Sequence, residues 1–119
     1  MKNNLKEFRE KSLLTAKQLS ILLNVSVHTY IAMEQDKFSL SPEIIIMIAK
    51  IYQMPTHFLF EDSILNQEEI DAIMINFSKL PNEEKRFQLA VKNLTGGVVE
   101  KSLHRQIRKL KNQIHDEIN

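Results

Sequence analysis

The side chains of this chain offer little that could act in catalysis or hold a metal. The sequence contains no cysteine, so a thiolate nucleophile and a thiolate metal site are both excluded. Its four histidines are scattered, and no pair of them has metal-ligand spacing backed by a carboxylate. The acid pairs Glu68-Glu69 and Glu83-Glu84 stand where helices are expected to start, and the positive end of a helix dipole explains such acids. We therefore expect no enzyme activity, no metal site and no cofactor.

Side chains at expected helix starts and turns are the more informative polar residues. Thr15 is placed to cap a helix over about 15–23, in which leucines recur at helical spacing. Ser26 is placed to cap the next helix, over about 27–35, in which Tyr30 and Met33 face inward. Asn24 lies where the chain must reverse, and asparagine tolerates the left-handed conformation that such a turn usually needs. Two short helices joined by a sharp turn form a unit whose second helix can lie in the major groove of DNA.

From about Leu5 to Phe60 the sequence resembles the Cro/C1-type helix-turn-helix family, the lambda-repressor-like XRE group of small bacterial and phage regulators. The joint spacing of many residues carries the resemblance: Arg9, Thr15, Leu19, Asn24-Val25-Ser26, Tyr30, Glu34, Pro42, Ile48-Ala49, Met54-Pro55-Thr56 and Leu59. The resemblance implies an all-α, five-helix domain that binds double-stranded DNA.

The resemblance further implies a DNA-contacting surface centred on the helix expected at 27–35. Ser26, Val27, His28 and Ala32 fall on base-edge positions, and Thr29 falls near the DNA backbone. The candidates for further phosphate contacts are Thr15, Lys17, Lys37 and Ser39. The reading face has no Arg, Gln or Asn, the residues that make bidentate base contacts, so we expect modest discrimination between DNA sequences.

One ion pair is implied for the frame of this domain. In the resembled family an arginine in the first helix pairs with a glutamate near the end of the recognition helix, and these positions match Arg9 and Glu34. A partly buried, bidentate pair of this kind orients the two helices, while its net stabilisation is small because both charges are desolvated.

The remaining helices of the domain follow from caps and apolar spacing. We expect a first helix over about 4–11 and a fourth that starts at Ser41-Pro42-Glu43, followed by a short helix capped by Thr56. The fourth helix is apolar nearly all round. Its core residues are expected to be Ile45, Ile48, Ala49 and Tyr52. The apolar residues left over, called here the surplus of this helix, are Ile44, Met47 and Ile51. Part of this surplus is a candidate dimer surface.

Residues 63–119 form an expected helical extension that follows a domain at 1–62. Two helices, one after Asn66 and one after Asn82, are expected to form a helical hairpin, and Gly96-Gly97 marks a hinge or a helix stop. A final helix over about 99–118 would carry a coiled-coil-like seam of Leu103, Ile107, Leu110 and Ile114. We expect a homodimer that assembles through this extension.

Charge and hydropathy set the remaining limits. Residues 1–60 carry seven Lys and Arg against five Asp and Glu, which permits nucleic-acid binding without indicating it. No stretch approaches the roughly 18 apolar residues of a membrane span, so we expect a cytoplasmic protein that joins the nucleoid when bound to DNA. The expected function is sequence-specific transcriptional regulation by a dimeric repressor on a palindromic operator.

A second class of protein remains open. Val27 and Ile31 form an apolar i,i+4 pair on the helix expected at 27–35. Such a face favours a protein-interaction module, or an antitoxin-like protein, that keeps the fold but reads bases weakly. The extension would then bind a protein partner or receive a signal. Binding to DNA that is sequence-selective and falls steeply with salt separates the regulator from this alternative.

Overall fold

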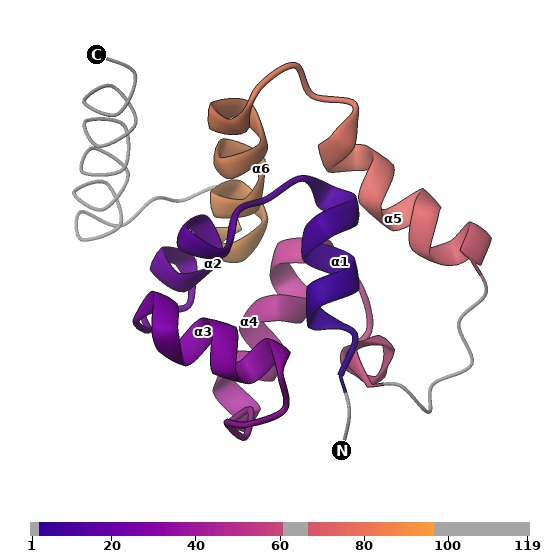
Figure 1. Cartoon of the computed structure of the whole chain (residues 1–119). Coiled ribbons are helices and arrows are strands. Elements are labelled where there is room, and N and C mark those ends of the chain that lie inside the picture. Colours follow the sequence, from indigo (N-terminus) through magenta and orange to yellow (C-terminus); the bar gives the residue numbers. More distant parts are fainter. Residues whose placement is uncertain (1–2, 61–66, 97–119) are drawn as a thin grey trace, which may run out of the picture.

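The helices follow the expected order along the chain. The computed structural model describes residues 3–60 and 67–96. Its elements are α1 (Leu5–Ser12), α2 (Ala16–Leu22), α3 (Val27–Glu34), α4 (Pro42–Tyr52), the 3₁₀ helix η1 (Thr56–Leu59), α5 (Gln67–Ser78) and α6 (Glu83–Thr95) (Figure 1). The expected all-α class is confirmed. The final helix expected over 99–118 and the boundary expected after residue 62 fall outside the described residues.

Side-chain caps fix where α2, α3 and α4 begin. The side chains of Thr15, Ser26 and Ser41 each accept a hydrogen bond from a backbone N–H in the first turn of their helix, and this satisfies a donor that the helix itself cannot pair. These three expected caps are confirmed. The cap expected at Thr56 is wrong: Pro55 holds the N-cap position of η1 in an extended conformation, and no side chain caps this short turn.

Residues in the left-handed backbone conformation lie at the ends of several helices or in the turns between them. Asn24 has a φ of 57° between α2 and α3, as the sequence predicts. Gly96 has a φ of 68° and ends α6, so this glycine is a helix stop. Glycine adopts that conformation without the steric cost that a Cβ imposes.

One hydrophobic core joins the N-terminal region to the extension. The inward residues expected in α2 and α3 are buried, among them Leu19, Tyr30 and Met33. The same cluster includes Ile70, Met74 and Phe77 of α5 and Phe87, Ala90 and Val91 of α6. Helix α5 packs chiefly on α1, and α6 packs chiefly on α4. In Figure 1, α5 lies on the side of α1 that is turned away from α3. The two helices expected as a hairpin are therefore each anchored on the N-terminal region.

Of the surplus apolar residues of α4, Ile51 is covered within the chain. Ile51 is fully buried, and the Asn93 side-chain amide of α6 donates to the Ile51 carbonyl at 2.8 Å. Ile44, Ile45 and Met47 are half-buried against the core. The assignment of Ile51 to a dimer surface is wrong, because α6 occupies that face of α4.

Candidate nucleic-acid interface

Two hydroxyl side chains, those of Ser26 and Thr29, lie at the start of α3 and differ in whether their proton is already hydrogen-bonded. Ser26 Oγ accepts from the Thr29 backbone N–H at 3.0 Å and donates to Thr29 Oγ1 at 2.9 Å. The Ser26 proton is thus engaged inside the protein. The Thr29 hydroxyl proton has no acceptor in the part of the chain that the structure describes. A phosphate oxygen accepts hydrogen bonds only, so Thr29 is the better phosphate donor of the two.

The faces of α3 separate as the sequence predicts. Tyr30 and Met33 are fully buried in the core. On the opposite side Ser26 and His28 are exposed, while the half-buried residues are Val27, Thr29 and Ala32. Ile31 is 38% exposed. The candidate base-contacting residues therefore lie together on one accessible face, and His28 is the long polar side chain among them.

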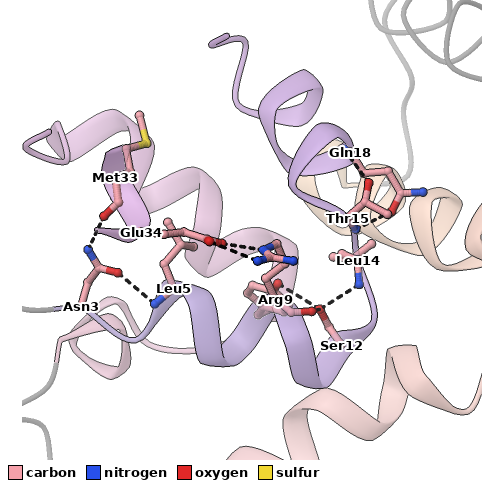
Figure 2. Close-up of polar contacts among 10 residues, drawn as sticks. Asn3, Leu5, Arg9, Ser12, Leu14, Thr15, Gln18, Met33 and Glu34 are labelled. Atoms are coloured by element: carbon pink, nitrogen blue, oxygen red, sulfur yellow. Dashed lines mark hydrogen bonds and ion pairs between the residues drawn. The ribbon is translucent and has the colours of Figure 1, made fainter. Parts of the chain in front are cut away.

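Arg9 and Glu34 connect the first helix to the end of α3. Arg9 Nε donates to Glu34 Oε2 at 2.6 Å, and Arg9 Nη2 donates to Glu34 Oε1 at 3.2 Å. The contact implied by the resemblance is present and bidentate (Figure 2). The hydrogen bond to Glu34 raises the pKa of Arg9, and the Glu34 side chain is only 5% exposed. This charged bridge fixes where α3 ends relative to α1.

A buried hydroxyl extends this bridge toward α4. Ser12 Oγ donates to the Arg9 carbonyl at 2.9 Å and shares a 3.1 Å hydrogen bond with the Tyr52 hydroxyl. Burial raises the pKa of Tyr52 well above its ordinary value, and it does the same for Tyr30 of α3. Both tyrosines therefore stay neutral in the folded protein.

Thr15 and Gln18 form a reciprocal cap at the start of α2. Thr15 Oγ1 accepts from the Gln18 N–H at 3.0 Å, and Gln18 Oε1 accepts from the Thr15 N–H at 3.0 Å. Figure 2 shows both contacts at the start of this helix. This capping box satisfies two backbone donors at once. As at Thr29, the Thr15 hydroxyl proton has no acceptor among residues 3–60 and 67–96, and it remains free to donate.

The N-terminal region is similar to a known protein family. Residues 5–59 match the family model described as Helix-turn-helix. The N-terminal region is a Cro/C1-type helix-turn-helix domain. Its family is one of DNA-binding regulators of the XRE type. No curated protein and no solved structure matches the chain.

The loop after the recognition helix of this helix-turn-helix domain is fixed by a residue far away in sequence. The Asn3 amide donates to the Met33 carbonyl at 2.9 Å and to the Asp36 carboxylate at 3.0 Å. Asp36 takes the left-handed conformation at a φ of 59°. The following candidates Lys37 and Ser39 are both exposed, beside the end of α3. Lys17 of α2 is half-buried.

Three polar residues of the N-terminal region were not identified from the sequence. Gln35 is exposed at the C-cap of α3 and follows His28 and Ala32 along one helical stripe, which adds an amide to the outward face of α3. Gln18 is buried, and its amide donates to the Glu83 carbonyl of α6 at 3.3 Å. The Thr15-x-x-Gln18 spacing is itself a capping-box signal. No local signal points to Asn3, because its partners lie 30 and 33 residues away.

Over the described helices, no segment is long and apolar enough to cross a membrane. Among the residues at 3–60 and 67–96, no group of three or more His, Asp or Glu side chains could hold a metal ion.

Proposed function

We propose that the protein is a dimeric transcriptional repressor that binds a palindromic operator through α3. The observation that carries this proposal is the outward face of α3, which presents His28 to solvent while Tyr30 and Met33 hold the helix in the core. In the cytoplasm such a protein would be associated with the nucleoid whenever it occupies its operator.

Base contacts would come from four residues at the start and middle of α3. Ser26, Val27, His28 and Ala32 would meet base edges, with His28 as a hydrogen-bonding group and the methyl groups of Val27 and Ala32 against thymine methyls. Such a face discriminates by few groups, so sequence-dependent deformability of the DNA would carry part of the specificity.

Phosphate contacts would position the domain on the duplex. The donors proposed for them are Thr15, Lys17, Thr29, Lys37 and Ser39. The free hydroxyl protons of Thr15 and Thr29 support two of these contacts, and the exposed ammonium group of Lys37 supports a third. Contacts of this kind fix register without reading sequence.

We assign dimer formation to the extension at 63–119, and within it to residues 98–119. On α4, Ile51 is buried and α6 packs on this helix, so Ile51 is not available to a second chain. In the described part of the chain, each large exposed apolar side chain belongs to a different helix or connecting segment: Leu13, Ile31, Phe38, Ile46 and Ile75. The seam of Leu103, Ile107, Leu110 and Ile114 is the longest apolar pattern that remains. A two-fold dimer would place its half-sites about one helical turn of DNA apart.

Selection from a randomised duplex library at near-physiological salt tests the proposal. We expect enrichment of a palindrome, and we expect His28→Ala to lose the preference at one base position of each half-site. His57→Ala is the matched control, since His57 is an exposed histidine on η1, outside the interface. Failure to enrich any sequence, or equal losses in the two variants, would contradict the proposed reading by α3.

The protein-interaction alternative is favoured by a single observation. Ile31 is 38% exposed on α3, four residues after Val27, and an apolar pair suits a protein surface better than a phosphate-lined groove. An affinity for duplex DNA that depends little on salt and on sequence would favour this alternative, because phosphate contacts release counterions.

A further inference from the structure

A hollow on the extension is separate from the surface formed by α2 and α3. It encloses about 540 Å³ between the end of α4, α5, the connection after α5, and α6. Its apolar lining includes Phe77, Leu80 and Leu89, with the ring of Tyr52 beside Phe77 at a centroid distance of 5.5 Å. Sites for small molecules have volumes of roughly 300–1,000 Å³, so the hollow has the volume of such a site. Its lining combines these apolar side chains with the amides of Gln53, Asn76, Gln88 and Asn93 and with lysines.

Three lysines surround this apolar lining. Lys79 lies in the connection after α5, and Lys85 and Lys92 lie seven residues apart on α6. All three are exposed. No ion pair involves them within the described ranges, where the paired cations are Arg9 and Lys11.

The charged side chains that line the hollow are opposite in sign to the net charge of residues 61–97. Residues 61–97 carry seven Asp and Glu against four Lys and Arg. The described residues that line the hollow nevertheless include no carboxylate, and their charged members are the three lysines. The charged side chains of the lining are thus all cationic and lie around an apolar surface, while the Glu84 carboxylate outside the lining accepts from the Gln88 amide at 3.2 Å. A concave site lined by cations attracts an anion.

We propose that this hollow binds a small organic anion with an apolar body, of the class of aromatic carboxylates. The ring would lie on Leu80 and Leu89, over the buried Phe77, and the carboxylate would lie within reach of Lys85 and Lys92. The proposal concerns binding alone and does not depend on how α3 reads DNA.

The lining of the hollow is in contact with the residues that hold α3. Tyr52 packs on Phe77 and shares a hydrogen bond with Ser12. Ser12 in turn donates to the Arg9 carbonyl, and Arg9 pairs with Glu34 at the end of α3. An effect of the anion on DNA affinity would rest on the proposed function. Binding of the anion is therefore measured in the absence of DNA.

A titration of the full-length protein followed by two-dimensional amide NMR tests the proposal. Indole-3-acetate and tryptamine are the probes, because they share an indole ring and carry opposite charges. We expect indole-3-acetate to give saturable shifts at Leu80, Gln88 and Leu89, and we expect tryptamine to give none that saturate. Equal binding of the two probes, or no saturation with either, would overturn the proposal.

Charge-reversed variants localise the binding. The double variant Lys85→Glu and Lys92→Glu should bind indole-3-acetate at least about tenfold more weakly. Lys50→Glu is the matched control, since Lys50 lies in the last turn of α4 as Lys92 lies in the last turn of α6, but outside the hollow. An equal loss in the control would contradict a local site. Shifts of the same amides with protein concentration, in the absence of a probe, would identify the hollow as an interface between copies and also overturn the proposal.

Discussion

Arg9 Nε donates a 2.6 Å hydrogen bond to Glu34 Oε2, and this contact joins the first helix to the last residue of α3. The Glu34 side chain is 5% exposed, whereas that of Arg9 is 21% exposed. The pair is therefore asymmetric: removal of the arginine leaves a nearly buried carboxylate without its cation, which costs more than the pair contributes.

Arg9→Ala should lower the free energy of unfolding by about 2 kcal/mol, a value below that of a fully buried pair because Arg9 remains partly hydrated. Urea unfolding followed by circular dichroism measures the change. Lys11→Ala is the matched control. Its surface pairs with Glu7 and Asp71 are 3.3 and 3.5 Å long, so its loss should stay below about 1 kcal/mol. An Arg9→Ala cost as small as that of the control would mean that the bridge is effectively solvent-exposed.

Ile51→Ala should lower the free energy of unfolding by about 3 kcal/mol, because the truncation leaves a cavity between α4 and α6. The loss should not depend on protein concentration, since α6 of the same chain covers this side chain. Ile46→Ala on the same helix is the control: Ile46 is 49% exposed and should change stability by less than about 1 kcal/mol. A loss that shrinks as the protein concentration rises would instead place Ile51 in an interface between chains.

The chain has two tyrosines, Tyr30 and Tyr52, and their ionisation during alkaline unfolding can be followed by the absorbance of tyrosinate. Burial raises the pKa of both above the ordinary value near 10. Below that value their contribution to stability is complete. Above it the unfolded state loses the phenolic protons while the folded state keeps them, so stability falls by about 1.4 kcal/mol per pH unit for each tyrosine.

We therefore expect the tyrosinate absorbance to appear together with the loss of helical circular dichroism as the pH rises above about 10. Tyr52→Phe should remove about half of the absorbance change and also the hydrogen bond to Ser12. Tyrosinate absorbance that appears while the helical signal is intact would contradict the burial of these side chains.

Local signals account for what the sequence predicted correctly. The caps Thr15 and Ser26 and the left-handed Asn24 each depend on residues within one turn, and all three are found in place. The outward face of α3 follows from helical spacing, since the burial of Tyr30 and Met33 determines which residues face outward.

Contacts between distant segments account for what the sequence did not predict. Asn3 reaches the residues after α3 from 30 and 33 positions away. Asn93 reaches the Ile51 carbonyl from 42 positions away. The apolar periodicity of one helix does not show which other helix packs on it. The sequence therefore left Ile51 among the candidates for a dimer surface, whereas this residue is buried in a chain whose α6 packs on α4.

Lys37→Gln should weaken binding to all duplexes about equally, because a phosphate contact carries no sequence information. The slope of log affinity against log salt should fall by about 1. Lys50→Gln is the matched control, as an exposed lysine on α4 outside the proposed interface. Fluorescence anisotropy with a labelled duplex at several salt concentrations measures both slopes. Identical slopes for the two variants would mean that Lys37 contributes only through the net charge.

Deletion of residues 98–119 should convert the protein to a monomer without unfolding it. The seam of Leu103, Ile107, Leu110 and Ile114 is removed, while α5 and α6 still complete the core on α1 and α4. Analytical ultracentrifugation gives the mass in solution, and circular dichroism checks that the helices remain. Because a two-fold operator needs two recognition helices at a fixed separation, the monomer should also lose most of its affinity for the palindrome and keep its weak affinity for a half-site. A truncated chain that stays dimeric at micromolar concentration would place the interface on the described helices, where Ile46 and Phe38 are the exposed apolar residues nearest to the recognition helix in the sequence.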